Sequence, residues 1–250
     1  MIKRLGTDLA AAIGFFTRLP VARLMPHDPR IDMAHAVWAF PVAGALAGLL
    51  GAGAYAIAAW AGLPPVLSAC WSVAATLLLT GALHEDGLAD MADGFGGGRD
   101  ASRKLEIMRD SRIGSYGALA LLLSSLVRIA ALAELAVPAR VCAALVASGA
   151  LSRAAIVLVL LLLPPARRDG LASMLHPLPR APAIVALGLA LALALVLLPV
   201  TMVLPAAACA LVAAVAVAWL ARRQVGGHTG DVLGACAVLA DCAVLSSLCA

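Results

Sequence analysis

Residues 140–163 read RVCAALVASGALSRAAIVLVLLLL, an apolar run whose interior carries one charged side chain, Arg153. An α-helix rises about 1.5 Å per residue, so a run of this length crosses the roughly 30 Å hydrocarbon core of a bilayer. The stretch therefore predicts a membrane-spanning helix, with lipid rather than water as the main surroundings of the chain.

The whole chain has the composition of a membrane protein. Of its 250 residues, 63% are hydrophobic and only 13% are charged, and the mean hydropathy is +1.01. Ordinary soluble domains are about 25% charged, so a water-soluble globule is excluded. The six cysteines form no C-x-x-C pair and lie in apolar segments, which favours buried thiols over disulfides.

Seven apolar stretches are long enough to span a bilayer: 36–61, 65–83, 115–136, 140–163, 182–199, 201–220 and 231–249. We predict an all-α fold, a polytopic integral membrane helical bundle of about seven transmembrane helices. The seven stretches form a single domain, residues 1–250. Before them, Lys3 and Arg4 precede a short apolar run that Arg18 ends, without a small-residue cleavage site. This predicts an amphipathic interfacial helix rather than a cleaved signal.

Basic residues fall on alternate connections. They gather in residues 1–35, 84–114 and 164–181 and at Arg222 and Arg223, whereas the connections near 63, 138 and 200 carry almost none. The positive-inside rule then places the N-terminus in the cytoplasm and the C-terminus outside. The same dispersal argues against nucleic acid as a partner, because the net charge of +4 is not concentrated in one patch.

The segment 84–114 holds half of the 14 acidic residues and reads as a cytoplasmic active-site segment. On a helix, Asp86, Asp90 and Asp93 stand at i, i+4 and i+7 and share one face, while Glu85 points away. Stacked carboxylates repel one another, and oxygen-only ligands suit Mg²⁺. The alternative is a solvated helix end whose acids pair with arginines. Zinc is disfavoured, since no thiolate or histidine pair has ligand spacing.

Two stretches after the acidic helix suit a phosphate ligand. Residues 94–99 are rich in glycine and predict either a phosphate-binding backbone or a flexible turn. The next turn contains three residues that could bind a diphosphate: Arg109, Ser111 and Arg112. The alternative is ion pairing along one helical face that Arg103, Glu106 and Asp110 would share.

A second polar cluster, residues 226–231, opens the last span from the same side. His228, Thr229 and Asp231 could form a second wall of the site, or the cluster could be a helix cap alone. Within the spans, Arg153 is either a substrate contact or part of a buried pair.

Residues 81–94 (GALHEDGLADMADG), 106–114 (EIMRDSRIG) and 227–231 (GHTGD) together resemble the cobalamin synthase family, adenosylcobinamide-GDP ribazoletransferase. Supporting matches are Phe16–Pro20, Phe40–Pro41 and Ser152–Arg153. The sequence departs from the family in its last span, where Val238 and Asp241 stand at positions that commonly hold glutamates. That departure puts in doubt a metal or substrate role for the last helix beyond Asp231.

The resemblance implies a multi-pass enzyme of the bacterial or archaeal cytoplasmic (inner) membrane. Adenosylcobinamide-GDP and α-ribazole, or α-ribazole 5′-phosphate, would give adenosylcobalamin, or its 5′-phosphate, and GMP, with Mg²⁺ required. Membrane lipid would surround the enzyme. Self-association into a homo-oligomer and contact with other cobalamin-assembly enzymes stay open.

We therefore expect the following roles. The metal ligands would be Asp86, Asp90, Asp93 and Glu106. The substrate-binding residues would be Arg109, Ser111, Arg112, Arg153, His228, Thr229 and Asp231. Asp110 would be the general base, with His84 or His228 as rivals.

Two other functions compete with this one. A partial likeness to the CDP-alcohol phosphatidyltransferases, carried by the D-x-x-D-G pattern of residues 90–94, would make the protein a lipid head-group transferase. The glycine link that follows is shorter than that pattern requires. A secondary transporter would need charges and broken helices near mid-membrane, whereas the carboxylates here cluster at one interface.

Overall fold

The computed structural model describes residues 2–21, 32–167 and 169–250. Three residues of the predicted basic groups, Arg23, Arg30 and Arg168, lie outside this part. The helices, in chain order, are α1 (Ile2–Phe16), α2 (Met33–Ala36), the 3₁₀ helix η2 (Val37–Ala39), α3 (Phe40–Trp60), α4 (Pro65–Thr80), α5 (Leu83–Gly97), α6 (Ala101–Ile107), α7 (Ser115–Leu135), α8 (Pro138–Leu162), η3 (Leu171–Leu175), α9 (Arg180–Leu197), α10 (Val200–Val225) and α11 (Gly230–Ser247). Every named element in the described ranges is helical, as predicted.

The predicted number of spans is confirmed. Within the described ranges, six helical segments are long and apolar enough to cross a membrane: Met33–Trp60, Ser115–Leu135, Pro138–Leu162, Arg180–Leu197, Val200–Val225 and Gly230–Ser247. A seventh span arises if α4 and α5 are taken together, although the two helices meet at an angle of 90°. The protein is thus a multi-pass helical bundle.

The bend between α4 and α5 comes from two residues with positive φ. Gly81 ends α4 in the left-handed conformation at φ 65°, and Ala82 follows at φ 55°. A Cβ at Gly81 would lie 2.4 Å from Nε of Arg18, so the glycine also lets the segment after α1 approach. The sequence placed the end of a span here, but the chain turns and continues at once as α5.

Helix α5 runs through most of the glycine-rich stretch that was expected to be a phosphate loop or a flexible turn. Its glycines are packing positions. A Cβ at Gly94 would lie 2.5 Å from the side chain of Met108, and one at Gly96 would lie 2.6 Å from the ring of Tyr116. The glycines therefore bring α6 and the start of α7 close to α5, and the interpretation as a flexible turn is wrong.

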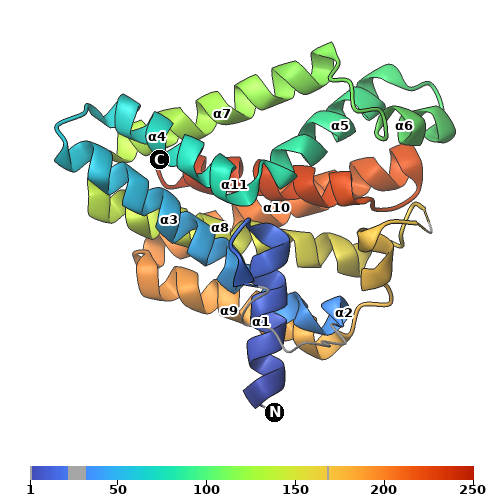
Figure 1. The fold of residues 1–250 in the computed structure, drawn as a ribbon, viewed down its shortest axis with the longest axis horizontal. Helices are drawn as coiled ribbons and strands as arrows, with labels where there is room; N and C mark the ends of the chain where they lie inside the picture. Colours follow the sequence, from blue (N-terminus) through green and yellow to red (C-terminus); the bar gives the residue numbers. More distant parts are fainter. Residues whose placement is uncertain (1, 22–31, 168) are drawn as a thin grey trace.

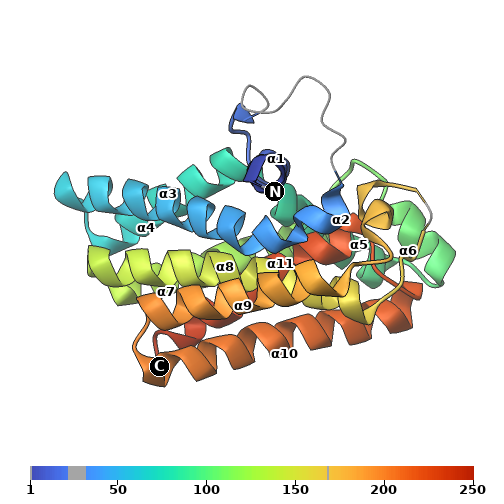
Figure 2. The same ribbon diagram turned by 90° about the horizontal axis from the view of Figure 1, so that it is seen from below.

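The long helices lie side by side and their connections alternate between two ends of the bundle. Figure 1 shows the connections after α6, α8 and α10 at one end and those after α3, α7 and α9 at the other; α1 crosses the long helices in Figure 1 and is seen end-on at the edge of the bundle in Figure 2. The arginine-bearing connections thus share one end, in agreement with the predicted alternation. The small-residue packing expected from the composition is present where α3 meets α8, because a Cβ at Gly44 would lie 2.0 Å from the carbonyl oxygen of Gly149.

Candidate active site

A cavity of about 240 Å³ lies beside the α4–α5 bend. It is walled by the end of α1, the start of α3, the first turns of α5 and α11, and the segment around η3. Its lining divides into two chemical types. The polar residues are His84, Asp86, Arg167, Asp169, Ser173, His228, Thr229 and Asp231, and the apolar ones include Phe15, Phe16, Phe40, Leu83, Ile156, Leu171, Leu175 and Leu233.

The acidic wall of the cavity is built by the close approach of α5 and α11. A Cβ at Gly87 would lie 2.9 Å from the carbonyl oxygen of Asp231, so only glycine allows this separation without movement of a helix. As a result Asp86 and Asp231, from distant parts of the sequence, line the same cavity. The carboxylate of the neighbouring Asp90 is repelled by the charges of Asp86, Asp231 and Asp93. It is attracted by the charge of Arg167.

The first turn of α11 is capped by Thr229, whose hydroxyl accepts a hydrogen bond from the backbone N–H of Val232 at 3.2 Å. The same hydroxyl donates to Asp231 at 3.1 Å. Arg167 binds the Asp231 carboxylate through one nitrogen at 3.2 Å, while its other terminal nitrogen, Nη1, is buried without a hydrogen-bond partner. Capping and a site role thus coexist in this cluster, because Arg167, Thr229 and Asp231 also line the cavity.

His228 is fixed by its backbone and leaves its ring free. Its N–H donates to the carbonyl of Pro164 at 2.9 Å, and its carbonyl accepts from the N–H of Ala166 at 2.8 Å. Both ring nitrogens are buried without a partner. Burial, followed by the charge of His176, lowers the pKa of His228 to about 4. The ring is therefore neutral at pH 7 and can both donate and accept a hydrogen bond.

Aromatic rings close the other side of the cavity. Phe16 stands edge-on to Phe15 and to Phe40, with ring centroids 5.0 and 4.7 Å apart. It also stacks on His84 at a centroid distance of 5.4 Å and an interplanar angle of 12°. His84 is thus held in place by an aromatic contact.

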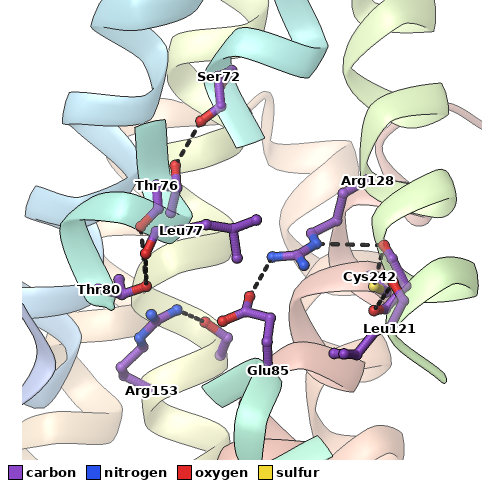
Figure 3. Close-up of polar contacts among 11 residues, drawn as sticks. Ser72, Thr76, Leu77, Thr80, Glu85, Leu121, Arg128, Arg153 and Cys242 are labelled. Carbon is purple, nitrogen blue, oxygen red and sulfur yellow. Dashed lines mark hydrogen bonds and ion pairs between the residues drawn. The ribbon is translucent and has the colours of Figure 1, made fainter. Parts of the chain in front are cut away.

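A buried charged network lies within the bundle (Figure 3), and His84 lines the same inner cavity as its members. Arg128 of α7 binds Glu85 of α5 at 2.8 Å, and Arg153 of α8 approaches from the other side and donates to Ser152 at 2.9 Å. These groups and Asp241 line an inner cavity of about 40 Å³, which is large and polar enough for water. Arg153 therefore lies behind the wall of the larger cavity rather than on its surface. The predicted orientation of Glu85, away from the three aspartates, is consistent with this placement.

Asp93 has a different environment from Asp86 and Asp90. It is buried, and its two carboxylate oxygens accept backbone hydrogen bonds from Gly114 at 2.6 Å and Gly117 at 2.9 Å. These bonds tie the middle of α5 to the start of α7.

The predicted diphosphate-binding residues Arg109, Ser111 and Arg112 are exposed, and both arginines already have carboxylate partners. Arg109 forms an ion pair with Asp169 at the cavity rim, and Ser111 is exposed to solvent. Arg112 binds Asp110 at 2.6 Å. Only Arg109 thus reaches toward the cavity, and a phosphate-binding role for Ser111 and Arg112 stays a prediction.

The predicted general base, Asp110, lies outside the cavity lining. Helix α6 ends at Ile107, so Asp110 does not continue the face on which Arg103 and Glu106 form an exposed ion pair at 2.7 Å. The side chain and the backbone N–H of Arg112 donate to Asp110 and lower its pKa to about 2. A carboxylate with so low a pKa, outside the cavity lining, is a poor proton acceptor at neutral pH.

The donor set fits a hard cation, although it differs from the predicted one. Among residues 2–21, 32–167 and 169–250, no three His, Cys, Asp or Glu side chains are close enough to hold a metal ion together. Mg²⁺ commonly takes only one or two carboxylates and completes its shell with water and substrate phosphate. A pair of carboxylates among Asp86, Asp90 and Asp231, whose charges repel one another, suits such a site, whereas Asp93 is occupied by backbone N–H groups and Glu106 is exposed.

Several cavity residues were missed from the sequence alone. Arg167 and Asp169 were only part of a basic or proline-rich connection, and Phe15 was only part of the α1 pattern. A signal was present for Phe16 and Phe40, which both belong to motifs that support the resemblance. The grouping of these residues depends on contacts between α1, α3 and the segment after α8, which no local pattern reveals.

Comparison with known proteins gives the same family across the whole chain. The family model for cobalamin-5-phosphate synthase matches residues 8–249. A protein of Bradyrhizobium diazoefficiens named adenosylcobinamide-GDP ribazoletransferase is 47% identical over 94% of this chain and 90% of its own length. Proteins with the same name from Mesorhizobium japonicum and Azorhizobium caulinodans are 44% and 47% identical, over 95% and 97% of this chain and 91% and 95% of their own lengths.

No solved structure matches the chain. The sequence comparisons favour neither the lipid head-group transferase nor the transporter. The motifs that carried the resemblance, the matched family model and relatives of more than 40% identity agree. The chain belongs to the cobalamin-5-phosphate synthase family.

Proposed function

We propose that this protein is an adenosylcobinamide-GDP ribazoletransferase. A ribose hydroxyl oxygen of α-ribazole, or of its 5′-phosphate, attacks the phosphorus on the corrinoid side of the diphosphate. The new phosphate ester forms as the bond to GMP breaks, and the hydroxyl proton is lost. The products are adenosylcobalamin, or its 5′-phosphate, and GMP.

One observation carries the proposal beyond family membership: the cavity joins an acidic wall, and an arginine with one unpartnered terminal nitrogen, to an apolar wall. Arg167 has a buried Nη1 without a partner and lines the cavity beside Asp231. A guanidinium donor at this place can bind a diphosphate oxygen. Arg109, held by Asp169 at the rim, supplies a second positive charge.

One or two of the carboxylates of Asp86, Asp90 and Asp231 would hold Mg²⁺, with water and phosphate oxygens as its other ligands. When bound, the ion neutralises negative charge that develops on the transferred phosphate. Without a cation these carboxylates repel one another, and the diphosphate would add further negative charge to the same place. The residues therefore favour a divalent cation beside the phosphate.

The attacking hydroxyl loses its proton at the acidic wall or to His84. Asp86, Asp231 and His84 line the cavity, whereas Asp110 does not. A phosphoryl transfer with a loose transition state needs little proton abstraction early, so a carboxylate of modest basicity suffices. Neutral His228 serves instead to donate a hydrogen bond to phosphate or ribose oxygens.

We further propose that the site faces the cytoplasm. The cavity uses residues of the connections after α8 and α10, at the end of the bundle where the arginine-bearing connections gather (Figure 1). By the positive-inside rule this end is cytoplasmic. Adenosylcobinamide-GDP would then meet the site from the compartment that contains guanine nucleotides.

The proposal is tested with the purified protein in detergent. Release of GMP from adenosylcobinamide-GDP and formation of adenosylcobalamin are expected only when α-ribazole, or its 5′-phosphate, and Mg²⁺ are both present. Chelation of the metal should abolish release, and added Mg²⁺ should restore it. Release of GMP without either acceptor, or head-group transfer from CDP-diacylglycerol, would overturn the proposal.

A further inference from the structure

The aromatic wall of the cavity has no part in phosphoryl transfer, yet it is the most distinctive apolar surface of the site. Phe15 and Phe16 come from α1 and Phe40 from the first residue of α3, so separate elements converge on it. Phe16 and Phe40 are 2% and 1% exposed and form the fixed base of this wall, whereas Phe15 is 36% exposed. Phe15 stacks on Phe40 with ring centroids 6.5 Å apart, so its other face is the one that remains open to a ligand.

The cavity lining divides by element. Helices α1 and α3 contribute only phenylalanines, whereas the carboxylates, Arg167 and Thr229 come from α5, α11 and the connections before η3 and α11. A ligand that fits this arrangement has a flat apolar end and a polar, oxygen-rich end. From these observations we propose that Phe15, supported by Phe16 and Phe40, forms the binding surface for the aromatic base of the nucleoside acceptor. This inference rests on the proposed function, because it assigns one of the two substrates of that reaction to a subsite.

The chemistry of the candidate rings favours the acceptor. The base of α-ribazole is a dimethylated benzimidazole, whose only polar atom away from the sugar is a single ring nitrogen. Guanine carries an amino group, an N–H and a carbonyl, each of which would lose its hydrogen bonds to water against phenylalanine side chains. A benzimidazole stacks on such rings without that loss.

The positions of the lining residues then determine where each of the two substrates lies. With the base at the aromatic end, the ribose of the acceptor points to the acidic wall, where Asp86 and Asp231 lie. The diphosphate of the other substrate meets it there, beside Arg167. The corrinoid ring is far larger than a cavity of about 240 Å³, so it remains outside the mouth. The cavity thus holds the acceptor while the corrinoid approaches from outside.

The test compares the KM values for the two substrates in Phe15→Ala. We expect the KM for α-ribazole to rise about tenfold, since a stacking contact and its buried area are lost. The KM for adenosylcobinamide-GDP and the kcat at saturation should stay close to those of the wild type. Phe15→Leu keeps the apolar volume but removes the aromatic face, and it should give an intermediate KM for α-ribazole. Leu5→Ala, an exposed change on the same helix outside the cavity lining, should alter neither KM.

A binding measurement gives the second readout. Riboside analogues of 5,6-dimethylbenzimidazole that lack the attacking ribose hydroxyl should compete with α-ribazole in the wild type and lose most of that competition in Phe15→Ala. A rise in the KM for adenosylcobinamide-GDP instead would show that the aromatic wall binds guanine or the adenosyl group. An unchanged KM for both substrates would also overturn the inference. Failure of the proposed function is distinct, because the wild type would then form no adenosylcobalamin at all.

Discussion

The carboxylate of Asp93 accepts a hydrogen bond of 2.9 Å from the backbone N–H of Gly117, in the first turn of α7. A second bond, from Gly114, occupies its other oxygen. The two glycines cannot carry side chains here, since a Cβ on either would lie 2.4 Å from an Asp93 oxygen. Of the three aspartates on this helical face, Asp93 joins α5 to α7, whereas Asp86 lines the cavity.

Asp93→Ala should therefore act mainly on stability. The change leaves the buried N–H of Gly117 without an acceptor, at a cost of about 1 to 3 kcal/mol, and also removes the bond from the part-buried N–H of Gly114. Thermal unfolding in detergent should show a clear loss of Tm, whereas Asp90→Asn should unfold close to the wild-type temperature. An unchanged Tm for Asp93→Ala together with complete loss of turnover would instead support a direct metal role.

A second prediction concerns the buried ion pair between Glu85 and Arg128. Glu85→Gln leaves an arginine inside the bundle without its nearest carboxylate, which typically costs about 3 to 5 kcal/mol, less what Asp241 offsets. The double variant Glu85→Gln/Arg128→Gln should recover part of that loss, and a double-mutant cycle on unfolding free energies measures the coupling.

The exposed pair of Arg103 and Glu106 is the matched control for that cycle. Because both side chains are in solvent, Glu106→Gln should leave the unfolding free energy within experimental error. Equal effects of Glu85→Gln and Glu106→Gln would contradict the assignment of a buried ionic network.

Gly87 should be required for activity because it lets α5 and α11 lie close together. Gly87→Ala places a methyl group against the backbone of Asp231, so α5 and α11 must move apart and the acidic wall opens. We expect a loss of turnover with a modest loss of stability. Gly188→Ala is the control, since nothing lies within 4 Å of a Cβ there and the residue is within α9. Full activity of Gly87→Ala would show that the close approach is not needed.

Stability should depend on pH through His228. Its folded-state pKa of about 4 lies below the ordinary value of 6.5, so the unfolded chain binds the extra proton first. The stabilisation is complete above about pH 6.5 and is lost as the pH falls toward 4. The Tm of the wild type should fall over this range, and that of His228→Gln should fall less. A parallel decline of both would place the titrating group elsewhere.

The spans and the shared face of three aspartates follow from local regularities. Hydropathy over about 20 residues identifies a span, and the 3.6-residue period aligns Asp86 with Asp90. The pairing of Glu85 with Arg128 does not follow, because the two lie 43 residues apart and many arginines compete for the same acid. Contacts that depend on helix packing are therefore the part that one sequence leaves open.

In the turn after α6, a local hydrogen bond from backbone to side chain replaces the helix that the residue spacing predicts. Arg103, Glu106 and Asp110 have the spacing of one helical face, yet the carboxylate of Asp110 accepts from the backbone N–H of Arg112 at 3.1 Å. Such a bond two residues along the chain favours a turn over continued helix. The predicted ion pair between Arg103 and Glu106 is confirmed, whereas Asp110 does not lie on the same helical face because α6 ends at Ile107.

The most direct test of the account is the turnover of Asp90→Asn beside Asp110→Asn. Both variants are assayed for GMP release and adenosylcobalamin formation from adenosylcobinamide-GDP, α-ribazole and Mg²⁺. Loss of several kcal/mol of charge stabilisation should slow Asp90→Asn at least about 100-fold while the protein stays folded. Asp110→Asn should keep most of its activity. Near wild-type turnover by folded Asp90→Asn, or loss of turnover by Asp110→Asn alone, would contradict the account.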